Sequence, residues 1–449
     1  MIDTIATDEH STIDVAVIGA GIAGLTAAHV VAKAGLRVLV LERNTFPGGR
    51  MSSEAFDGCI VDRGAYTLSG YAGRTFALAE EMGCRDRITP LTPWAGYAHV
   101  GSVRHYRSDS MPAMALGVGL LPGDMIASLR MLQASKRLAP HLRLHKPDED
   151  TFTLEQESAA DYALRIGGPR LLERVAYPMI SALYISDPEN TSAVALLATL
   201  RYVQGIRLFN SPHGIGFLCD ELARRVPVRF MCEVQSLTVT DGGVDLKLAA
   251  SEETLHAKAA ILTAPAPDTL HLLPEAGEPL ATCLTDVSYT SCVVTAFVIQ
   301  GRLAEKAFSI ALPRDRFPLL ASLTCEHNKH PARVPPDRDV LTAYSTAAGG
   351  ERLLALDDEA VQAAVLREVE QVYPRLSDRV ENCRIYRWPV ACSQLRPGDL
   401  RRRKALQTAL PHNGPLFLAG DYLVSSSSIE GSLISGLASG TRAAQYADT

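Results

Sequence analysis

The chain has 449 residues and a formal net charge of −6, and this sign argues against a nucleic-acid-binding protein, which presents a basic face to phosphates. Hydrophobic residues make up 47% of the chain and charged residues 21%, the composition of an ordinary globular protein with room for two or three domains. The nine cysteines form no Cys-x-x-Cys pair, which predicts reduced thiols in a cytoplasm and no zinc or iron–sulfur site.

Residues 1–13 contain no basic region and no apolar core, so we do not expect a signal peptide. A buried strand is predicted at Val15 to Ile18, followed by the glycine turn Gly19-x-Gly21-x-x-Gly24 and a helix that stops at Gly35. In such a turn the first glycine permits the tight bend, the second lets a pyrophosphate approach the backbone, and the third lets helix pack on strand. The free N–H groups of the helix N-terminus favour a diphosphate there.

A second strand, Arg37 to Glu42, ends on an acid 18 residues after Gly24. A carboxylate at that place can accept hydrogen bonds from both ribose hydroxyls, which is the third part of a dinucleotide site. The glycine turn therefore predicts dinucleotide binding, and a merely structural turn is the alternative.

Two further motifs follow. The loop Arg43 to Arg50 ends in Gly48-Gly49-Arg50, and a short strand leads into Asp62-x-Gly64-Ala65. Together with the glycine turn and Glu42, these motifs resemble the flavin amine oxidase superfamily, which also contains porphyrinogen oxidases and phytoene-type desaturases. The resemblance implies FAD as the cofactor, with the delocalised guanidinium of Arg50 along the diphosphate and flavin.

Residues 73–205 are predicted to be mostly helical, with apolar residues at helical spacing in Thr75–Met82, Met125–Leu138 and Ser158–Ile166. No apolar run reaches the ~18 residues of a membrane span. The longest, Met111 to Met125, is broken by two prolines and three glycines. We expect a flexible lid or a buried loop there, and a peripheral membrane contact is the alternative. Tyr177–Ser192 resembles a loop that precedes a helix on the substrate lobe of porphyrinogen oxidases.

The resemblance implies that the chain then returns to the FAD-binding domain. Pro212–Gly216 opens a helix, a strand is predicted at Val228–Val234, a hairpin turn at Asp241–Gly243, and a core strand at Ala260–Pro265. The resemblance places the backbone of Val234 against adenine. Further strands at Ser291–Ile299 and Val340–Ser345, and a helix at Asp358–Val372, are predicted beyond it.

The predicted fold class is α/β. A Rossmann-like FAD-binding domain with a parallel sheet, formed by 12–72, 206–266 and 381–449, is interleaved with an α+β substrate-binding lobe formed by 73–205 and 267–380. The basic cluster Arg401–Lys404 is expected in a solvated loop.

Near the C-terminus, a buried strand from Gly414 ends on Asp421, and a helix begins after Ser428, a plausible N-cap. Small residues line two adjacent faces of this helix. Close packing against another helix would also require small residues there. The segment resembles the second FAD motif of the superfamily, in which Asp421 would hold the ribitol or diphosphate and the N–H of Ile429 would meet the flavin O2. The candidate cofactor-binding residues are Gly19, Gly21, Ile22, Ala23, Gly24, Glu42, Gly49, Arg50, Gly64, Ala65, Tyr66, Val234, Gly420, Asp421 and Ile429.

No cysteine or histidine lies in Tyr422–Gly431, where the superfamily's covalent link sits, so FAD should be bound non-covalently. FAD of this kind takes a hydride at N5 and passes the electrons to oxygen or another acceptor. The strand Ser288–Val294 lacks the lysine that amine oxidases usually place near N5, and Ser425–Ser428 replaces their aromatic pair, which leaves only Tyr422 as an aromatic face.

Arg387–Pro389 and Arg396–Gly398 resemble the run before the last FAD segment in porphyrinogen oxidases and desaturases. We therefore expect oxidation or desaturation of an apolar or cyclic small molecule. An amine or amino-acid oxidase is the alternative, and a non-catalytic flavin-fold scaffold is the third reading. The sequence identifies no catalytic base and no metal ligands. Trp388 is as well explained as a core aromatic, and His213 as a structural residue.

Overall fold

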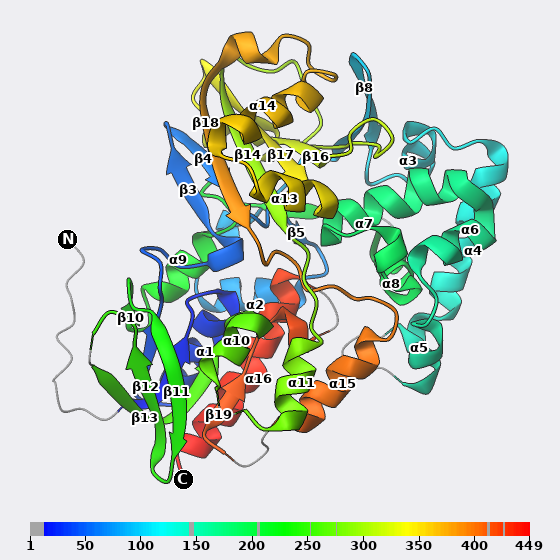
Figure 1. Ribbon diagram of the computed structural model, residues 1–449. Coiled ribbons are helices and arrows are strands. Elements are labelled where there is room, and N and C mark those ends of the chain that lie inside the picture. The colour runs from blue at the N-terminus through cyan, green and yellow to red at the C-terminus, as the bar shows by residue number, and fades with distance from the viewer. Residues whose placement is uncertain are drawn as a thin grey trace.

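The computed structural model describes residues 13–142, 148–203, 207–251, 253–274, 276–410, 414–424 and 427–449. Its lower lobe is built on a seven-stranded sheet (Figure 1). The strand order is β10 (Val228–Arg229), β2 (Val38–Leu41), β1 (Ile13–Ile18), β13 (Thr254–Leu262), β12 (Gly243–Leu248) and β11 (Val234–Thr240), with β19 (Leu416–Leu418) also paired to β13. β10, β2, β1, β13 and β19 are parallel, and β11 and β12 form an antiparallel hairpin. The predicted α/β class with a parallel sheet is confirmed.

Two helices from opposite ends of the chain pack against each other beside this sheet: α1 (Ile22–Lys33) and α16 (Ile429–Ala447). A Cβ atom at Gly436 would lie 2.2 Å from the carbonyl oxygen of Ala23, and one at Gly440 would lie 2.7 Å from that of Ala27. Only glycine permits so close an approach, so the small residues of α16 do serve helix packing. This contact brings the first and last motifs of the chain together.

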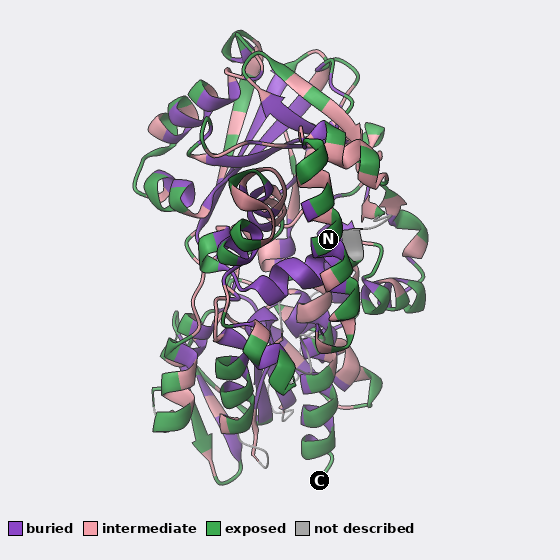
Figure 2. Ribbon diagram, turned by 90° about the vertical axis from the view of Figure 1, so that its right-hand side faces the viewer, coloured by how far each residue is buried: buried purple, intermediate pink, exposed green. Residues whose placement is uncertain are grey.

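The remaining helices of the lower lobe surround this pair and the sheet. They are α2 (Gly73–Glu81), α9 (Phe217–Ala223), α10 (Ala266–Leu272), α11 (Glu278–Thr285) and α15 (Asp399–Ala409). Buried residues fill the middle of both lobes, and exposed residues lie along the outer faces of the helices (Figure 2).

The upper lobe contains a second seven-stranded sheet, which is antiparallel except for one parallel pair, β15 and β7. Its order is β18 (Val380–Trp388), β14 (Cys292–Gln300), β17 (Arg338–Ser345), β16 (Leu320–Cys325), β15 (Ser309–Ala311), β7 (Trp94–His99) and β8 (Ser102–Arg107). One face packs on α13 (Ala347–Leu354) and α14 (Asp358–Val369) through Phe297, Leu341 and Val365. The other face, with Val294 and Tyr344, packs on the hairpin of β3 (Ser53–Phe56) and β4 (Cys59–Asp62).

A helical arm extends from the upper lobe on the right of Figure 1. It contains α3 (Met111–Gly117), α4 (Pro122–Arg137), α5 (Glu149–Leu154), α6 (Ala159–Leu171), α7 (Tyr177–Tyr184) and α8 (Ala193–Val203). The arm has its own apolar core, which includes Met131, Phe152 and Leu196. A small sheet of β5 (Leu68–Ser69), β9 (Leu208–Asn210) and β6 (Thr89–Pro90) lies where the chain enters and leaves the region. No helix in the described part of the chain is long and apolar enough to cross a membrane.

The structure confirms most of the predicted elements, with boundaries shifted by a few residues, and corrects four of them. The strand predicted at Val228–Val234 is two strands, β10 and β11, because the chain turns at Met231 with φ +54°. Tyr177–Tyr184 is helical rather than looped, and Met111–Met125 forms α3 and the first turn of α4 rather than a buried loop.

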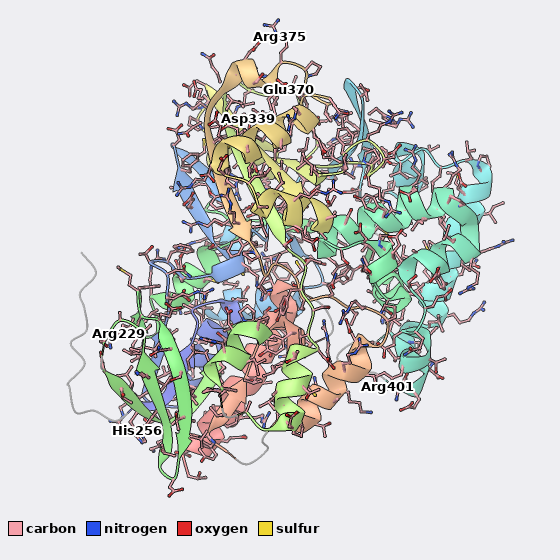
Figure 3. The ribbon with its side chains drawn as sticks, in the orientation of Figure 1. Arg229, His256, Asp339, Glu370, Arg375 and Arg401 are labelled. Atoms are coloured by element: carbon pink, nitrogen blue, oxygen red, sulfur yellow. The ribbon has the colours of Figure 1, made fainter. Side chains whose placement is uncertain are left out.

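The basic cluster Arg401–Lys404 lies in helix α15, not in a loop. Arg401 points from α15 toward α5 (Figure 3), where its guanidinium lies 4.6 Å from the centre of the Phe152 ring. Arg403 is buried and donates to the carbonyl oxygens of Gln394 and Val424, so it fixes the segment that follows Asp421.

Strand pairing also bears on the domain division. β18 belongs to the second sheet although 381–449 was expected in the FAD-binding domain, and α10 and α11 contribute Leu272 and Leu284 to the core of the first sheet. We therefore propose a division in which the chain leaves the lower lobe after Thr285 and re-enters it after Trp388.

Candidate active site

The glycine turn between β1 and α1 has two crowded positions and one open position. Gly19 has φ +105°, and a Cβ atom at Gly24 would lie 2.0 Å from the carbonyl oxygen of Gly19, so both residues must be glycine. At Gly21, a Cβ atom would meet nothing within 4 Å. The first turn of α1, which contains Ile22 and Ala23, has no acidic residue and no side-chain cap. The turn therefore offers a backbone surface and N–H groups to an anionic group.

Glu42 lies beside this turn at the end of β2 and is only 6% exposed. Its Oε2 accepts a hydrogen bond from the backbone N–H of Ala20 at 2.7 Å, and its Oε1 accepts from the backbone and side chain of Asn44 at 2.9 and 2.6 Å. These bonds fix the carboxylate: they occupy both lone pairs of Oε1 and leave one lone pair on Oε2. The backbone N–H of Cys232 donates to the Glu42 carbonyl, which brings the segment before Val234 to the same place. A groove next to Glu42 is lined by Asn44, Met231 and Glu233, among others.

The loop Gly48–Arg50 is attached to the glycine turn and to the segment around Gly64. The N–H of Gly48 donates to the Ala20 carbonyl at 2.8 Å, and the N–H of Ala65 donates to the Arg50 carbonyl at 2.9 Å. A Cβ atom at Gly64 would lie 2.5 Å from that Arg50 oxygen, so the close approach needs glycine. Gly49 has φ +51° and faces open space. The three motifs of the N-terminal region thus form one continuous surface.

Arg50 and Asp421 form a two-pronged ion pair across 371 residues of sequence. Arg50 Nη2 lies 2.7 Å from Asp421 Oδ1, and Nη1 lies 3.1 Å from Oδ2. Ser393 and Ser427 also donate to Oδ2. Burial alone would raise the pKa of Asp421, but the charge and hydrogen bonds of Arg50 outweigh it and lower that pKa to about 2. The carboxylate is therefore ionised at neutral pH.

The N-terminus of α16 lies next to this pair. Gly420, with φ +157°, donates its N–H to Ser435 Oγ at 3.0 Å, and Ser428 caps the helix by accepting from the N–H of Gly431, as predicted. Ile429 is the first residue of the helix. The Glu430 carboxylate accepts from the backbone N–H groups of residues 74 and 75 and so caps α2 from another part of the chain. Serine residues 425 and 426 lie outside the described residues.

Sequence reasoning missed the buried ion cluster behind this surface. Asp62, Glu326, Lys329 and Arg333 all have side chains that are 0% exposed. Lys329 Nζ lies 2.7 Å from Glu326 Oε1 and 3.2 Å from Asp62 Oδ2, and Arg333 Nη2 lies 2.8 Å from Glu326 Oε2 and 2.9 Å from Asp62 Oδ2. Two acids and two bases make the cluster neutral. The Glu-x-x-Lys spacing on one short helix, α12 (Glu326–Lys329), was its only local signal.

Tyr66 lies between this cluster and the second sheet. Its ring centre lies 4.6 Å from that of Tyr344 on β17, with the two rings tilted by 38°, and the Lys329 ammonium lies 4.9 Å from the Tyr66 ring centre. An aromatic pair is thus present, although no sequence motif indicated it. Burial raises the pKa of both phenols, so both are neutral at ordinary pH.

The surroundings of the other residues that the sequence analysis discussed for the reaction indicate no catalytic role for them. Tyr422 is 0% exposed within the core of the lower lobe, so the aromatic face predicted there is wrong. Trp388 Nε1 donates to the Arg63 carbonyl at 2.8 Å. Cys292 is buried on the same face of β14 as Val294. His213 is exposed beside the turn that precedes α9.

The family model of flavin-containing amine oxidoreductases matches residues 22–447 of this chain. The 15-cis-phytoene desaturase of Synechococcus elongatus is 22% identical over 458 residues, covering 94% of this chain and 94% of the relative. The mitochondrial protoporphyrinogen oxidase of Nicotiana tabacum is 39% identical over 190 residues, 41% of this chain and 35% of the relative.

Solved structures are similar in fold. A protein described as a putative protoporphyrinogen oxidase from Exiguobacterium sp. 255-15 superposes with a TM-score of 0.72 at 21% identity, covering 96% of this chain and 98% of the other. A redesigned putrescine oxidase superposes with a TM-score of 0.80 at 16% identity, covering 96% of this chain and 99% of the other.

Proposed function

This chain belongs to the flavin-containing amine oxidoreductase family and is a flavin-dependent oxidoreductase, and from this premise we propose that it uses FAD to oxidise or desaturate a largely apolar or cyclic small molecule. The observation that supports the proposal most is the convergence of Gly21, Glu42, Arg50 and Asp421, from both ends of the chain, on one continuous surface.

In this proposal, each part of the surface holds one part of the cofactor. The open backbone at Gly21 and the first turn of α1 receive the diphosphate, and the remaining lone pair of Glu42 Oε2 accepts a ribose hydroxyl. The backbone of Val234 faces adenine, as the resemblance implies, and the hydrogen bond from Cys232 to the Glu42 carbonyl supports this by bringing the segment near Glu42. Arg50 is 31% exposed, so part of its guanidinium remains available beyond Asp421. Ile429 presents its N–H at the helix N-terminus, where negative charge is stabilised.

FAD supplies a hydride acceptor at N5, which oxygen or another acceptor later reoxidises. The protein's own contribution is the buried face of the second sheet with Cys292, Val294 and Tyr344, which packs on the β3–β4 hairpin beside Tyr66. This face is apolar and β14 carries no lysine, while Lys329 is fully engaged with two buried carboxylates. Apolar surroundings of this kind suit an apolar or cyclic substrate better than a strongly hydrated one. The phytoene desaturase and porphyrinogen oxidase relatives support the same substrate class.

Amine oxidation is the second candidate, and the Tyr66–Tyr344 pair favours it. Aromatic faces attract cations, so a tilted pair could hold an ammonium group. The putrescine oxidase fold supports this reading at the level of the fold only. A non-catalytic scaffold is the third reading, and turnover tests it.

Anaerobic mixing of the purified holoprotein with two substrate panels should separate these functions. We expect porphyrinogens or polyenes to bleach the oxidised flavin band, because hydride transfer to the flavin removes that absorption whatever the later acceptor. Primary and secondary amines and amino acids form the second panel. If amines alone bleach the band at ordinary turnover rates, ~1–1000 per second, the amine reading replaces ours. If neither panel bleaches it while dithionite does, the scaffold reading gains support.

We also predict that FAD is bound non-covalently, because residues 422–431 contain no cysteine or histidine. Acid precipitation of the yellow protein should therefore leave the flavin in the supernatant, with the mass of FAD. Flavin that remains with the precipitate would contradict this prediction. A cytoplasmic location, predicted from the spacing of the nine cysteines, is part of the same proposal.

A further inference from the structure

Helix α15 carries a buried cation, Arg403, that forms no ion pair within the described part of the chain. The residue is 6% exposed, and its guanidinium donates to two backbone carbonyl oxygens, those of Gln394 and Val424. Burial lowers the pKa of Arg403, and the charges of Asp421 and Asp399 oppose this effect in part. Burying a charge costs free energy that bonds to neutral carbonyls only partly offset, so the arrangement indicates a specific task.

The two carbonyl groups belong to the two segments that supply hydroxyl donors to Asp421. Gln394 directly follows Ser393, whose hydroxyl donates to Asp421 Oδ2 at 3.1 Å. Val424 shortly precedes Ser427, whose hydroxyl donates to the same oxygen at 2.8 Å. The buried guanidinium therefore ties together the two segments that hydrogen-bond to this carboxylate.

Arg50 fixes the first of these segments at its other end. Its Nη1 donates to the carbonyl oxygen of Ala391 at 2.7 Å, and both of its terminal nitrogens bind Asp421. Residues 391–394 are thus held at one end by Arg50 and at the other by Arg403. Among the described residues, Arg50 hydrogen-bonds to the carboxylate directly, whereas Arg403 is linked to it through the serine hydroxyls.

The helix that carries Arg403 is itself fixed by the helical arm. The carboxylate of Glu155, at the end of α5, is buried and accepts from the backbone N–H groups of Leu400 and Arg401 at 2.8 and 3.2 Å. These groups belong to the first turn of α15, so an acid from the arm caps a helix of the lower lobe where the two meet (Figure 1). Because this cap fixes the backbone of α15, it also fixes the position of the Arg403 guanidinium.

We propose that Arg403 is a positioning residue for the flavin. It holds Ser393 and Ser427 as donors to Asp421, and it fixes the segment that leads into α16. This inference rests on the proposed function, in which the flavin lies at Arg50 and at the N-terminus of α16. Preorganised donors and a helix N-terminus stabilise the negative charge that a flavin gains on reduction. Removal of Arg403 should therefore destabilise the reduced flavin more than the oxidised flavin.

The reduction potential of the bound flavin, measured against reference dyes, tests this proposal without any substrate. Arg403→Met should lower the potential by about 30 mV or more, which corresponds to a tenfold loss in the binding of reduced relative to oxidised flavin. Arg403→Lys should restore part of the difference, because an ammonium group can still donate to the carbonyl oxygens. Arg401→Met is the matched control on the same helix: the Arg401 side chain is 59% exposed, so the potential should not change.

A double-mutant cycle separates positioning from a general loss of structure. If Arg403 acts through the two serines, Arg403→Met should shift the potential far less in the Ser393→Ala/Ser427→Ala background than in the unchanged protein. Equal shifts in both backgrounds would overturn the proposal. A lower urea midpoint of Arg403→Met with an unchanged potential would also overturn it, because Arg403 would then have a structural role alone.

Hydrogen exchange of the apoprotein gives a readout that does not depend on the cofactor. The amides of residues 421–424 and 427–431 should exchange faster in Arg403→Met than in the unchanged protein, while those of α1 keep their protection. Equal exchange of these residues would contradict the proposal even in a protein that binds flavin. A purified protein that binds no flavin would instead contradict the proposed function, and the exchange rates would still decide whether Arg403 fixes this segment.

Discussion

Replacing Arg333 with methionine should lower the free energy of unfolding by about 3–5 kcal/mol, because breaking a buried ion pair leaves an uncompensated charge in the interior. The Arg333 side chain is 0% exposed and lies 2.9 Å from Asp62 and 2.8 Å from Glu326. Burial alone would raise the pKa of Asp62, but the Arg333 and Lys329 charges lower it to about 2. Asp62 therefore stays ionised and needs both cations.

The loss is measured by urea titration of Arg333→Met, followed by far-UV circular dichroism and by flavin release. Arg338→Met is the matched control: it removes an arginine of the same region that pairs with Asp57 and Glu381 but is 32% exposed on its side chain. Exposed pairs contribute little, so the control should hardly move the transition. Equal urea midpoints for the two variants would show that the ion cluster does not stabilise the fold.

The position of the ion cluster explains why the loss of stability in Arg333→Met should also disturb the candidate active site. Asp62 ends β4, next to the Gly64–Tyr66 turn that binds the Arg50 backbone, whereas Glu326, Lys329 and Arg333 come from the upper lobe. The cluster therefore fastens one lobe to the other behind Tyr66. Flavin release should accompany the first part of the unfolding transition of Arg333→Met, since the turn loses its support.

Gly24→Ala should lower stability, whereas Gly21→Ala should weaken FAD binding alone, although both residues belong to one motif. The added methyl at Gly24 meets the Gly19 carbonyl oxygen at 2.0 Å and Thr263 Oγ1 at 2.9 Å, and a backbone oxygen cannot move aside cheaply. We expect a loss of about 3 kcal/mol in stability together with loss of flavin. At Gly21 the methyl meets no protein atom within 4 Å, and φ −72° suits alanine.

Gly21→Ala should therefore unfold at the same urea concentration as the unchanged apoprotein and yet bind FAD at least roughly tenfold more weakly. The methyl would occupy the space that the diphosphate needs, and charged hydrogen bonds lost there are worth about 1.5–3 kcal/mol each. Flavin fluorescence titration of the two apoproteins measures the affinity. Unchanged affinity of Gly21→Ala would place the diphosphate elsewhere, whereas a large loss of apoprotein stability would mean that the turn is tighter than it is in the structure.

Much of the candidate site could be predicted from the sequence, because local stereochemistry determines it. Gly19, Gly24 and Glu42 act through neighbours within about one strand–turn–helix–strand unit, where spacing alone fixes geometry. Ser428 was predicted as an N-cap for the same reason: a cap depends on the three residues that follow it. The α/β class followed from this strand–turn–helix–strand unit together with the resemblance of the motifs to the flavin amine oxidase superfamily.

Tertiary structure alone decided which distant residues meet. Arg50 and Asp421 are 371 positions apart, and Asp62 and Lys329 are 267 apart, so no local pattern relates them. The aromatic partner of Tyr66 is Tyr344 on β17. Tyr422, which was predicted to be an aromatic face of the site, is buried in the core. The apolar run near Met111 was predicted to be a flexible lid or a buried loop, because hydrophobicity shows that a side chain avoids water but not whether the fold supplies a neighbour to cover it. In this chain the neighbours of α3 and α4 cover one side of each helix and leave four large apolar side chains outside.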